Sequence, residues 1–247
     1  MPKFFVQPEH IQGDLIHLEG ENVNHIKNVL RLTIGDKILI NDGQGKDYKC
    51  IISALEAQKI TVRIEMITAN AVEPVIKTVL FQSLIKGEKM EWVIQKSVEI
   101  GVTEIVPLCT TRCVVKLDTP KKMQSKIERW NKIAESAAKQ SGRGVVPIVR
   151  EPMPFEVALD YMAEQNGLVL IPYEKEDRLS IRTALQETST QTFGILIGPE
   201  GGFTEEEVAK ALAKDAQAVT LGKRILRSET ASLVALTSIM YETGEMD

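Results

Sequence analysis

The sequence predicts an α/β protein with a small N-terminal β-barrel over residues 1–71 and a larger α/β domain over residues 72–247. Two patterns predict this fold. Residues 1–71 contain short runs rich in Val and Ile, separated by tight turns, which is typical of a small barrel. From Pro74 onward, strand patterns alternate with helix patterns, which indicates a mainly parallel sheet covered by helices on both faces.

The N-terminal part is predicted to hold four strands and one helix. The strands are expected at residues 15–18, 37–41, 48–55 and 60–67, and the helix at residues 21–30. Helical spacing places Val23, Ile26, Val29 and Leu30 on one face of this helix. That face is expected to pack on the barrel.

The second part is predicted to alternate regularly. Strands are expected at residues 76–82, 104–109, 146–149, 168–172, 193–197 and 218–221, and helices at 87–100, 120–141, 154–164, 181–186, 204–213 and 229–242. The long helix begins at Pro120 and is closed by Gly142. In such sheets, ligands bind outside the carboxyl ends of the strands. Three segments at such strand ends have unusual sequences and are candidates for a binding site, at residues 171–174, 197–202 and 221–227.

The composition is that of an ordinary globular protein, with 43% hydrophobic and 26% charged residues. No apolar run reaches the ~18 residues that a membrane span needs, and the first residues lack a signal-peptide core. Three cysteines, Cys50, Cys109 and Cys113, are too few for a disulfide framework and are expected to be buried free thiols. We therefore expect a cytoplasmic protein.

Metal chemistry is not expected. The three histidines, His10, His17 and His25, all fall in the N-terminal part. Cys109 and Cys113 lie four residues apart without a histidine nearby, so a zinc site is not predicted.

The charge is unevenly distributed along the chain. The net charge is −4, but residues 116–150 carry nine basic and three acidic residues. Lys122, Lys126 and Arg129 share one face of the long helix, which is typical of a solvated face or of an RNA-binding surface. Trp130 on the same helix is expected to be a core residue rather than a base-stacking one.

A glycine-rich loop at residues 198–202 lies between a strand and a helix. Thr204 and Glu207 form a capping box, and Phe203 and Val208 are spaced as a hydrophobic staple. Glutamates 200, 205, 206 and 207 crowd this helix start and would repel phosphate. The loop therefore suits a neutral or cationic ligand, or else it is simply a tight turn that requires glycine.

Residues 221–231 form the second candidate segment. Ser228 is expected to be the N-cap of the last helix, flanked by Arg227 and Glu229, which form either a surface ion pair or part of a site. The usual phosphate-binding motifs are absent: the glycines at residues 43–48 lie between two strands and open no helix.

These segments carry a family resemblance. Residues 197–203 (IGPEGGF) and 221–231 (LGKRILRSETA) resemble the RsmE family of SPOUT-class RNA methyltransferases. Support comes from residues 86–91 (KGEKME), 95–102 (QKSVEIGV) and 137–143 (AAKQSGR), from Arg129-Trp130, and from His25 with residues 29–31. The resemblance covers nearly the whole chain.

The resemblance implies a fold and a reaction. The N-terminal part would be a PUA-like RNA-binding domain, and the larger domain would hold S-adenosylmethionine in a C-terminal trefoil knot. The protein would act as a homodimer without a metal and would methylate N3 of one uridine in the decoding region of 16S ribosomal RNA.

The resemblance also implies roles for individual residues. Cofactor binding is expected at Ile197, Gly198, Pro199, Glu200, Gly201, Gly202, Leu221, Gly222, Ile225, Leu226, Thr230 and Ala231. Glu229 is the candidate general base, and Arg227 the candidate that stabilises charge on the uridine. RNA contacts are expected from Arg31, Arg112, Lys122, Lys126, Arg129 and Arg143.

Two other functions compete with this one. A non-catalytic RNA-binding or ribosome-assembly factor of the same fold would not need the cofactor motifs. A nucleotide-dependent enzyme acting on a small molecule is disfavoured by the absent phosphate motifs and the acidic helix start.

Overall fold

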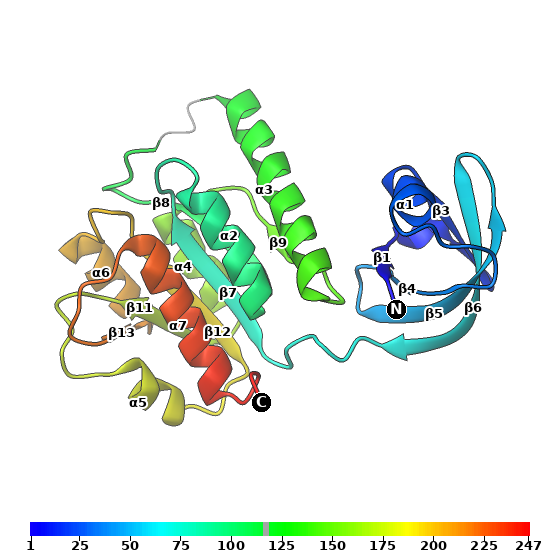
Figure 1. Cartoon of the computed structure of the whole chain (residues 1–247). Helices are drawn as coiled ribbons and strands as arrows, with labels where there is room; N and C mark the ends of the chain where they lie inside the picture. The colour runs from blue at the N-terminus through cyan, green and yellow to red at the C-terminus, as the bar shows by residue number, and fades with distance from the viewer. Residues whose placement is uncertain (116–118) are drawn as a thin grey trace. The chain divides into compact units, whose positions relative to one another are not determined.

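A computed structural model describes residues 1–115 and 119–247. The chain forms two compact units, which we describe separately (Figure 1). Unit 1 comprises residues 1–73 and 138–146, and unit 2 comprises residues 74–137 and 147–247. Residues 138–146, expected within the larger domain, are thus grouped with the N-terminal unit. Among the described residues, no helix is long and apolar enough to cross a membrane.

Unit 1 is built on a curled six-stranded sheet. Its strands, in spatial order, are β1 (Lys3–Phe5), β4 (Lys37–Asn41), β5 (Lys46–Leu55), β6 (Lys59–Ala69), β3 (Leu15–Glu19) and β2 (Ile11–Gln12). Only the β1–β4 pair among these is parallel. The four predicted strands are confirmed. The very short β1 and β2, and the 3₁₀ turn at Pro8–His10, are not predicted because two or three residues carry no readable period.

The predicted helix over residues 21–30 is only partly α-helical in the structure. It begins as α1 (Glu21–Asn24) and continues as a π-helical turn over His25–Val29, in which Leu30 N donates to His25 O at 2.9 Å. The wider turn rotates the following side chains away from the sheet. Val23 and Ile26 are therefore buried as predicted, whereas Val29 and Leu30 are exposed.

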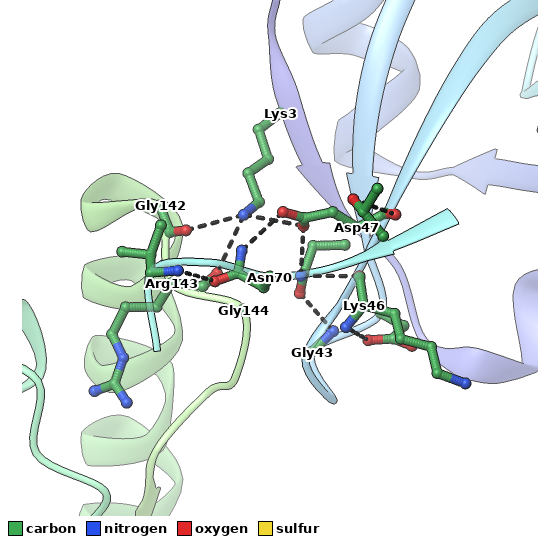
Figure 2. A network of polar contacts seen from close by, with 12 residues as sticks. Lys3, Gly43, Lys46, Asp47, Asn70, Gly142, Arg143 and Gly144 are labelled. Atoms are coloured by element: carbon green, nitrogen blue, oxygen red, sulfur yellow. Dashed lines mark hydrogen bonds and ion pairs between the residues drawn. The ribbon is translucent and has the colours of Figure 1, made fainter. Parts of the chain in front are cut away.

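A polar network fixes residues 142–146 within unit 1 (Figure 2). Lys3 Nζ donates to Gly142 O at 2.9 Å and pairs with Asp47 Oδ1 at 3.2 Å. Gly45 N donates to Gly144 O at 2.9 Å. A Cβ on Gly144 would lie 2.4 Å from the side chain of Asn70, so glycine is required for this close approach.

Glu73 completes the attachment of this segment. Its carboxylate accepts from Gly144 N at 2.7 Å and from Val145 N at 3.0 Å, and it pairs with Arg143 Nη2 at 2.7 Å. Burial raises the pKa of the Glu73 carboxyl, but Arg143 and the two backbone amides lower it by more than burial raises it. The net pKa therefore lies below its usual value. Glu73 is thus held as an anion by a buried cation.

Unit 2 is built on a parallel sheet. The spatial order is β10 (Met153–Pro154), β8 (Glu104–Cys109), β7 (Lys77–Ser83), β12 (Thr192–Ile197), β11 (Leu168–Pro172) and β13 (Gln217–Val219), and β9 (Ile148–Val149) also pairs with β8. Every named pair is parallel. The mainly parallel sheet is therefore confirmed, and the carboxyl ends of its strands meet at one edge.

Helices cover both faces of this sheet, as predicted (Figure 1). They are α2 (Lys89–Ile100), α3 (Pro120–Ser141), α4 (Phe155–Ala163), α5 (Ile181–Gln186), α6 (Glu205–Leu212) and α7 (Ser228–Glu242). Helices α4 and α6 share a core with Phe81 and alternate strand residues, while α7 packs on α2, β7 and β12. Trp130 on α3 is only 3% exposed, so its predicted core role is confirmed.

The cysteines depart in part from expectation. All three are free thiols, and Cys50 is buried as predicted. Cys109 is exposed and Cys113 is partly exposed, because they lie at and beyond the end of β8 rather than inside the sheet, so their predicted burial is wrong. In the part of the chain that the structure describes, no group of three metal-ligating side chains comes together.

We expect Glu73→Gln to destabilise the protein by about 3 kcal/mol at neutral pH, because it removes the carboxylate that pairs with the buried Arg143 cation. Since the pKa of Glu73 is lowered by folding, this stabilisation is present above the unfolded value of about 4.3 and is lost as the pH falls through the folded value. Denaturant unfolding at neutral and acidic pH measures both effects.

The matched control is Asp160→Asn, whose partner Lys214 lies 2.8 Å away in an exposed ion pair. This change should cost less than about 0.5 kcal/mol. A Glu73→Gln protein as stable as the control at neutral pH would contradict the assignment.

Candidate active site

Three loops meet at the carboxyl edge of the unit 2 sheet. They follow β11, β12 and β13, which are neighbours in the parallel order. Tyr173 N, after β11, donates to Val219 O at the end of β13 at 3.1 Å. The predicted convergence of these strand ends is confirmed, and their register explains it.

The loop after β12 is a tight turn made of glycines. Gly202 has φ +66° and its N–H donates to Pro199 O at 2.9 Å. A Cβ on Gly198 would lie 3.1 Å from the backbone of Gly202 and Phe203, so the turn closes on itself at this residue. Any side chain at Gly202 would meet the Glu174 carboxylate at 3.5 Å. The glycines thus bring backbone groups and one carboxylate close together.

The predicted capping box at the start of α6 is confirmed, and its glutamate also bonds to the backbone that follows β8. Thr204 Oγ1 accepts from Glu207 N at 3.1 Å, and Glu207 Oε2 accepts from Thr204 N at 2.8 Å. The second oxygen of Glu207 accepts from Thr111 N at 2.8 Å, which lies beyond the end of β8. Glu207 is therefore buried and occupied, and it does not face a ligand.

Two further contacts hold the glycine loop. Arg112 Nη1 donates to Gly201 O at 2.7 Å and to Phe203 O at 3.2 Å. Lys86 N donates to Glu200 Oε1 at 3.1 Å. The resemblance predicts that Arg112 contacts RNA. In the structure its guanidinium clamps the loop, and its role toward RNA stays a prediction.

The start of α7 corrects one prediction. The N-cap is Arg227, which makes no side-chain cap bond, and Ser228 is already the first helical residue. The Ser228 hydroxyl instead donates to Gly198 O at 2.5 Å and accepts from Gln82 Nε2 at 3.0 Å. This hydroxyl connects the start of α7, and the segment 221–227 before it, to the glycine loop. A capping hydroxyl would instead have bonded to the backbone of its own helix.

Glu229 lies in the first turn of α7 and is mostly buried. Its Oε1 pairs with Lys89 Nζ at 3.0 Å, and its buried Oε2 has no hydrogen-bond partner among residues 1–115 and 119–247. Burial raises the pKa of the Glu229 carboxyl, but its backbone amide, Lys89 and Arg227 outweigh burial, so the net pKa lies below its usual value. The group is an anion at neutral pH with one oxygen unsatisfied.

The rest of segment 221–231 lies along the same edge. Leu221, Leu226 and Ala231 are partly exposed, while Gly222 (φ +107°) and Thr230 are exposed. Ile225 is 89% exposed, an unusual state for a branched apolar side chain. The chain therefore presents apolar surface beside the glycine loop.

Two residues of the site, Gln82 and Lys89, were not predicted from the sequence. Gln82 follows the apolar residues 79–81 of the predicted strand, and an amide directly after such a run was the available signal. Lys89 lies in the KGEKME motif, but a lysine alone gave no sign of its partner on α7.

The predicted RNA contacts divide between the units. Lys122, Lys126 and Arg129 lie on α3 in unit 2, where Glu91 is 2.6 Å from Arg129 and 3.9 Å from Lys126. Arg31 is exposed in unit 1, at φ +53°. The prediction for Arg143 does not fit the structure, because its side chain is 4% exposed and paired with Glu73.

Comparison with known families defines the class. Residues 72–240 match the RNA methyltransferase domain, and residues 18–65 match the RNA methyltransferase PUA domain. The curled sheet of unit 1 and the parallel sheet of unit 2, with its glycine loop, are thus the two parts of a PUA-containing RNA methyltransferase.

Relatives identify the family. The chain is 39% identical to ribosomal RNA small subunit methyltransferase E of Bacillus subtilis over 98% of this chain and 97% of that protein. It is 34% identical to a crystal structure of this enzyme from Neisseria gonorrhoeae bound to S-adenosyl methionine, with a TM-score of 0.82 over 98% and 97% of the two chains. The protein belongs to the ribosomal RNA small subunit methyltransferase E family.

A second solved relative has the same fold. A putative methyltransferase from Legionella pneumophila, in complex with the same cofactor, is 32% identical with a TM-score of 0.81, over 97% of this chain and 96% of that one. The PUA-like and α/β parts of the predicted fold are confirmed by these matches, while the trefoil knot stays a prediction.

We expect Gly198→Ala to destabilise the protein by about 1 kcal/mol or more, because the new methyl group meets backbone atoms that cannot rotate away. This corresponds to a melting temperature lower by roughly 3 °C. Gly201→Ala is the matched control in the same loop, because its Cβ would lie 3.5 Å from the flexible Arg112 side chain. Equal melting temperatures for the two variants would contradict the tight turn described here.

Proposed function

We propose that this protein transfers a methyl group from S-adenosylmethionine to N3 of a uridine in 16S ribosomal RNA of the small subunit. The observation that carries the proposal is the glycine loop held against the first turn of α7 by Ser228, in a member of the small subunit methyltransferase E family. A non-catalytic RNA-binding factor would have no need of this joined pair of loops.

The edge of the sheet suits this cofactor. S-adenosylmethionine carries a sulfonium cation and no phosphate, and the carboxylates of Glu174 and Glu200 lie at the glycine loop. The backbone of residues 197–202 and 221–222, with Pro199, Ile225, Leu226, Thr230 and Ala231, would hold its adenosine and methionine parts. The cofactor supplies an activated methyl group, so the protein's contribution is mainly to position two reactants.

The chemistry requires that the N3 proton of uridine leave before or during transfer. Glu229 is the proposed proton acceptor, because its Oε2 has no partner in the structure and its low pKa keeps it ionised. A carboxylate of low pKa is a weak base. A weak base needs help to remove the proton. We therefore propose that Arg227, one residue earlier, stabilises the negative charge that develops on the uridine carbonyls.

RNA would be held by phosphate contacts. The cationic face of α3 with Lys122, Lys126 and Arg129 is partly balanced by Glu91, and phosphates would compete with that carboxylate for the same cations. Arg31 in unit 1 and the clamp residue Arg112 complete the proposed RNA contacts. We propose that the protein works in the cytoplasm as a homodimer.

The first test is methyl transfer. We expect the purified protein to transfer label from S-adenosylmethionine to small ribosomal subunits that lack the modification, and nucleoside analysis to recover it as 3-methyluridine. Label in another nucleoside would contradict the proposed atom. Cofactor binding without any transfer would favour the non-catalytic RNA-binding factor, and stabilisation by ATP would favour a nucleotide-dependent enzyme.

Glu229→Gln tests the proton acceptor. It keeps the shape of the side chain and removes its basicity, so turnover at saturating substrates should fall about 100-fold or more. Because the pKa of Glu229 is lowered, the wild-type rate should show no loss from this group as the pH falls from about 8 to about 6. Glu206→Gln, an exposed glutamate on α6, is the control. Undiminished turnover in Glu229→Gln would exclude it as the base.

A further inference from the structure

Gln82 is a fully buried polar residue at the carboxyl end of β7, the strand beside β12. Its neighbours in the strand, Leu80 and Phe81, are apolar and fully buried. A buried amide is costly unless all of its hydrogen-bonding groups are satisfied. The contacts that satisfy it therefore show what holds it in place.

Both polar atoms of the Gln82 amide have partners. Nε2 donates to Ser83 O at 2.9 Å and to Ser228 Oγ at 3.0 Å. Oε1 accepts from Ser232 Oγ. Since the Ser83 carbonyl can only accept, the amide orientation is determined, with nitrogen toward Ser83 and Ser228.

The Ser228 hydroxyl passes this constraint on to the glycine loop. It accepts from Gln82, so its single proton is directed to Gly198 O, at 2.5 Å. The chain of hydrogen bonds thus runs from β7 through the first turn of α7 to the loop after β12. These elements come from three distant stretches of sequence.

We infer that Gln82 is a positioning residue for the cofactor site. Its amide fixes to β7 the Ser228 hydroxyl that bonds to Gly198, and with it the first turn of α7, which carries Glu229. It contacts neither cofactor nor substrate itself. This inference rests on the proposed function, because it assigns Gln82 a role at that same site.

The chemistry at this position is specific to glutamine. Glutamate would turn an acceptor oxygen toward the Ser83 carbonyl, which only accepts, and would bury a charge. Methionine has a similar shape but offers no donor to Ser228. Ser228 would then keep its bond to Gly198 without the contact that fixes it to β7.

The experiment measures cofactor affinity and turnover in the full-length protein. Gln82→Met and Ser228→Ala should each weaken S-adenosylmethionine binding in calorimetry about 10-fold, because each breaks the hydrogen-bonded link from β7 through Ser228 to the glycine loop. The double variant should bind nearly as well as the weaker single variant, because both changes break the same link. Two independent effects would instead multiply to about 100-fold.

Ser97→Ala is the matched control. Ser97 is a fully buried residue on α2 of the same unit, and its hydroxyl has no hydrogen-bond partner among the residues that the structure describes. Its removal should leave cofactor affinity unchanged. A melting curve for each variant separates general destabilisation from the effect on the site.

The outcomes separate this inference from the proposed function. If wild-type protein binds the cofactor and both Gln82→Met and Ser228→Ala bind equally well, the positioning role is wrong and the function stands. Multiplicative losses in the double variant also overturn it. If the wild-type protein does not bind the cofactor, the proposed function fails. If Gln82→Met does not fold, Ser228→Ala still decides, since it removes a single oxygen from the same link.

Discussion

The hydrogen bond from the Ser228 hydroxyl to the Gly198 carbonyl is the contact on which the site in unit 2 depends. Parallel strands bring the ends of β11, β12 and β13 to one edge, but they do not determine how far each loop extends beyond it. The Ser228 bond determines how close the start of α7 lies to the glycine loop. With it, the first turn of α7, which carries Glu229, is bonded to the glycine loop rather than merely near the same edge.

The glycine loop is held by contacts on several sides. Arg112 holds two of its carbonyls, Glu207 ties it to the backbone after β8, and Gly198 packs against its own turn. A loop fixed from several sides loses little entropy when it binds a ligand. Four glutamates near the helix start suggested electrostatic exclusion of phosphate. The structure refines this: Glu207 is used internally, Glu205 pairs with Lys175, and Glu206 is exposed on α6, while Glu200 and Glu174 are the carboxylates at the glycine loop.

Most of the fold could be predicted from the sequence, because its signals are local. Alternating apolar patterns and the capping residues at Thr204 located the principal helices and strands of unit 2 to within a few residues. What could not be predicted depends on contacts across the sequence. The hydroxyl of Ser228 fits a cap pattern equally well, and only the neighbouring Gln82 and Gly198 decide its role. The burial of Arg143 likewise depends on Glu73, 70 residues earlier.

This edge of the sheet suits a cofactor that carries a sulfonium cation and no phosphate. Calorimetric titration of the full-length protein with S-adenosylmethionine, and separately with ATP, tests it most directly. We expect saturable binding of one S-adenosylmethionine per chain and no heat of binding with ATP. Binding of ATP, or no binding of S-adenosylmethionine, would contradict it.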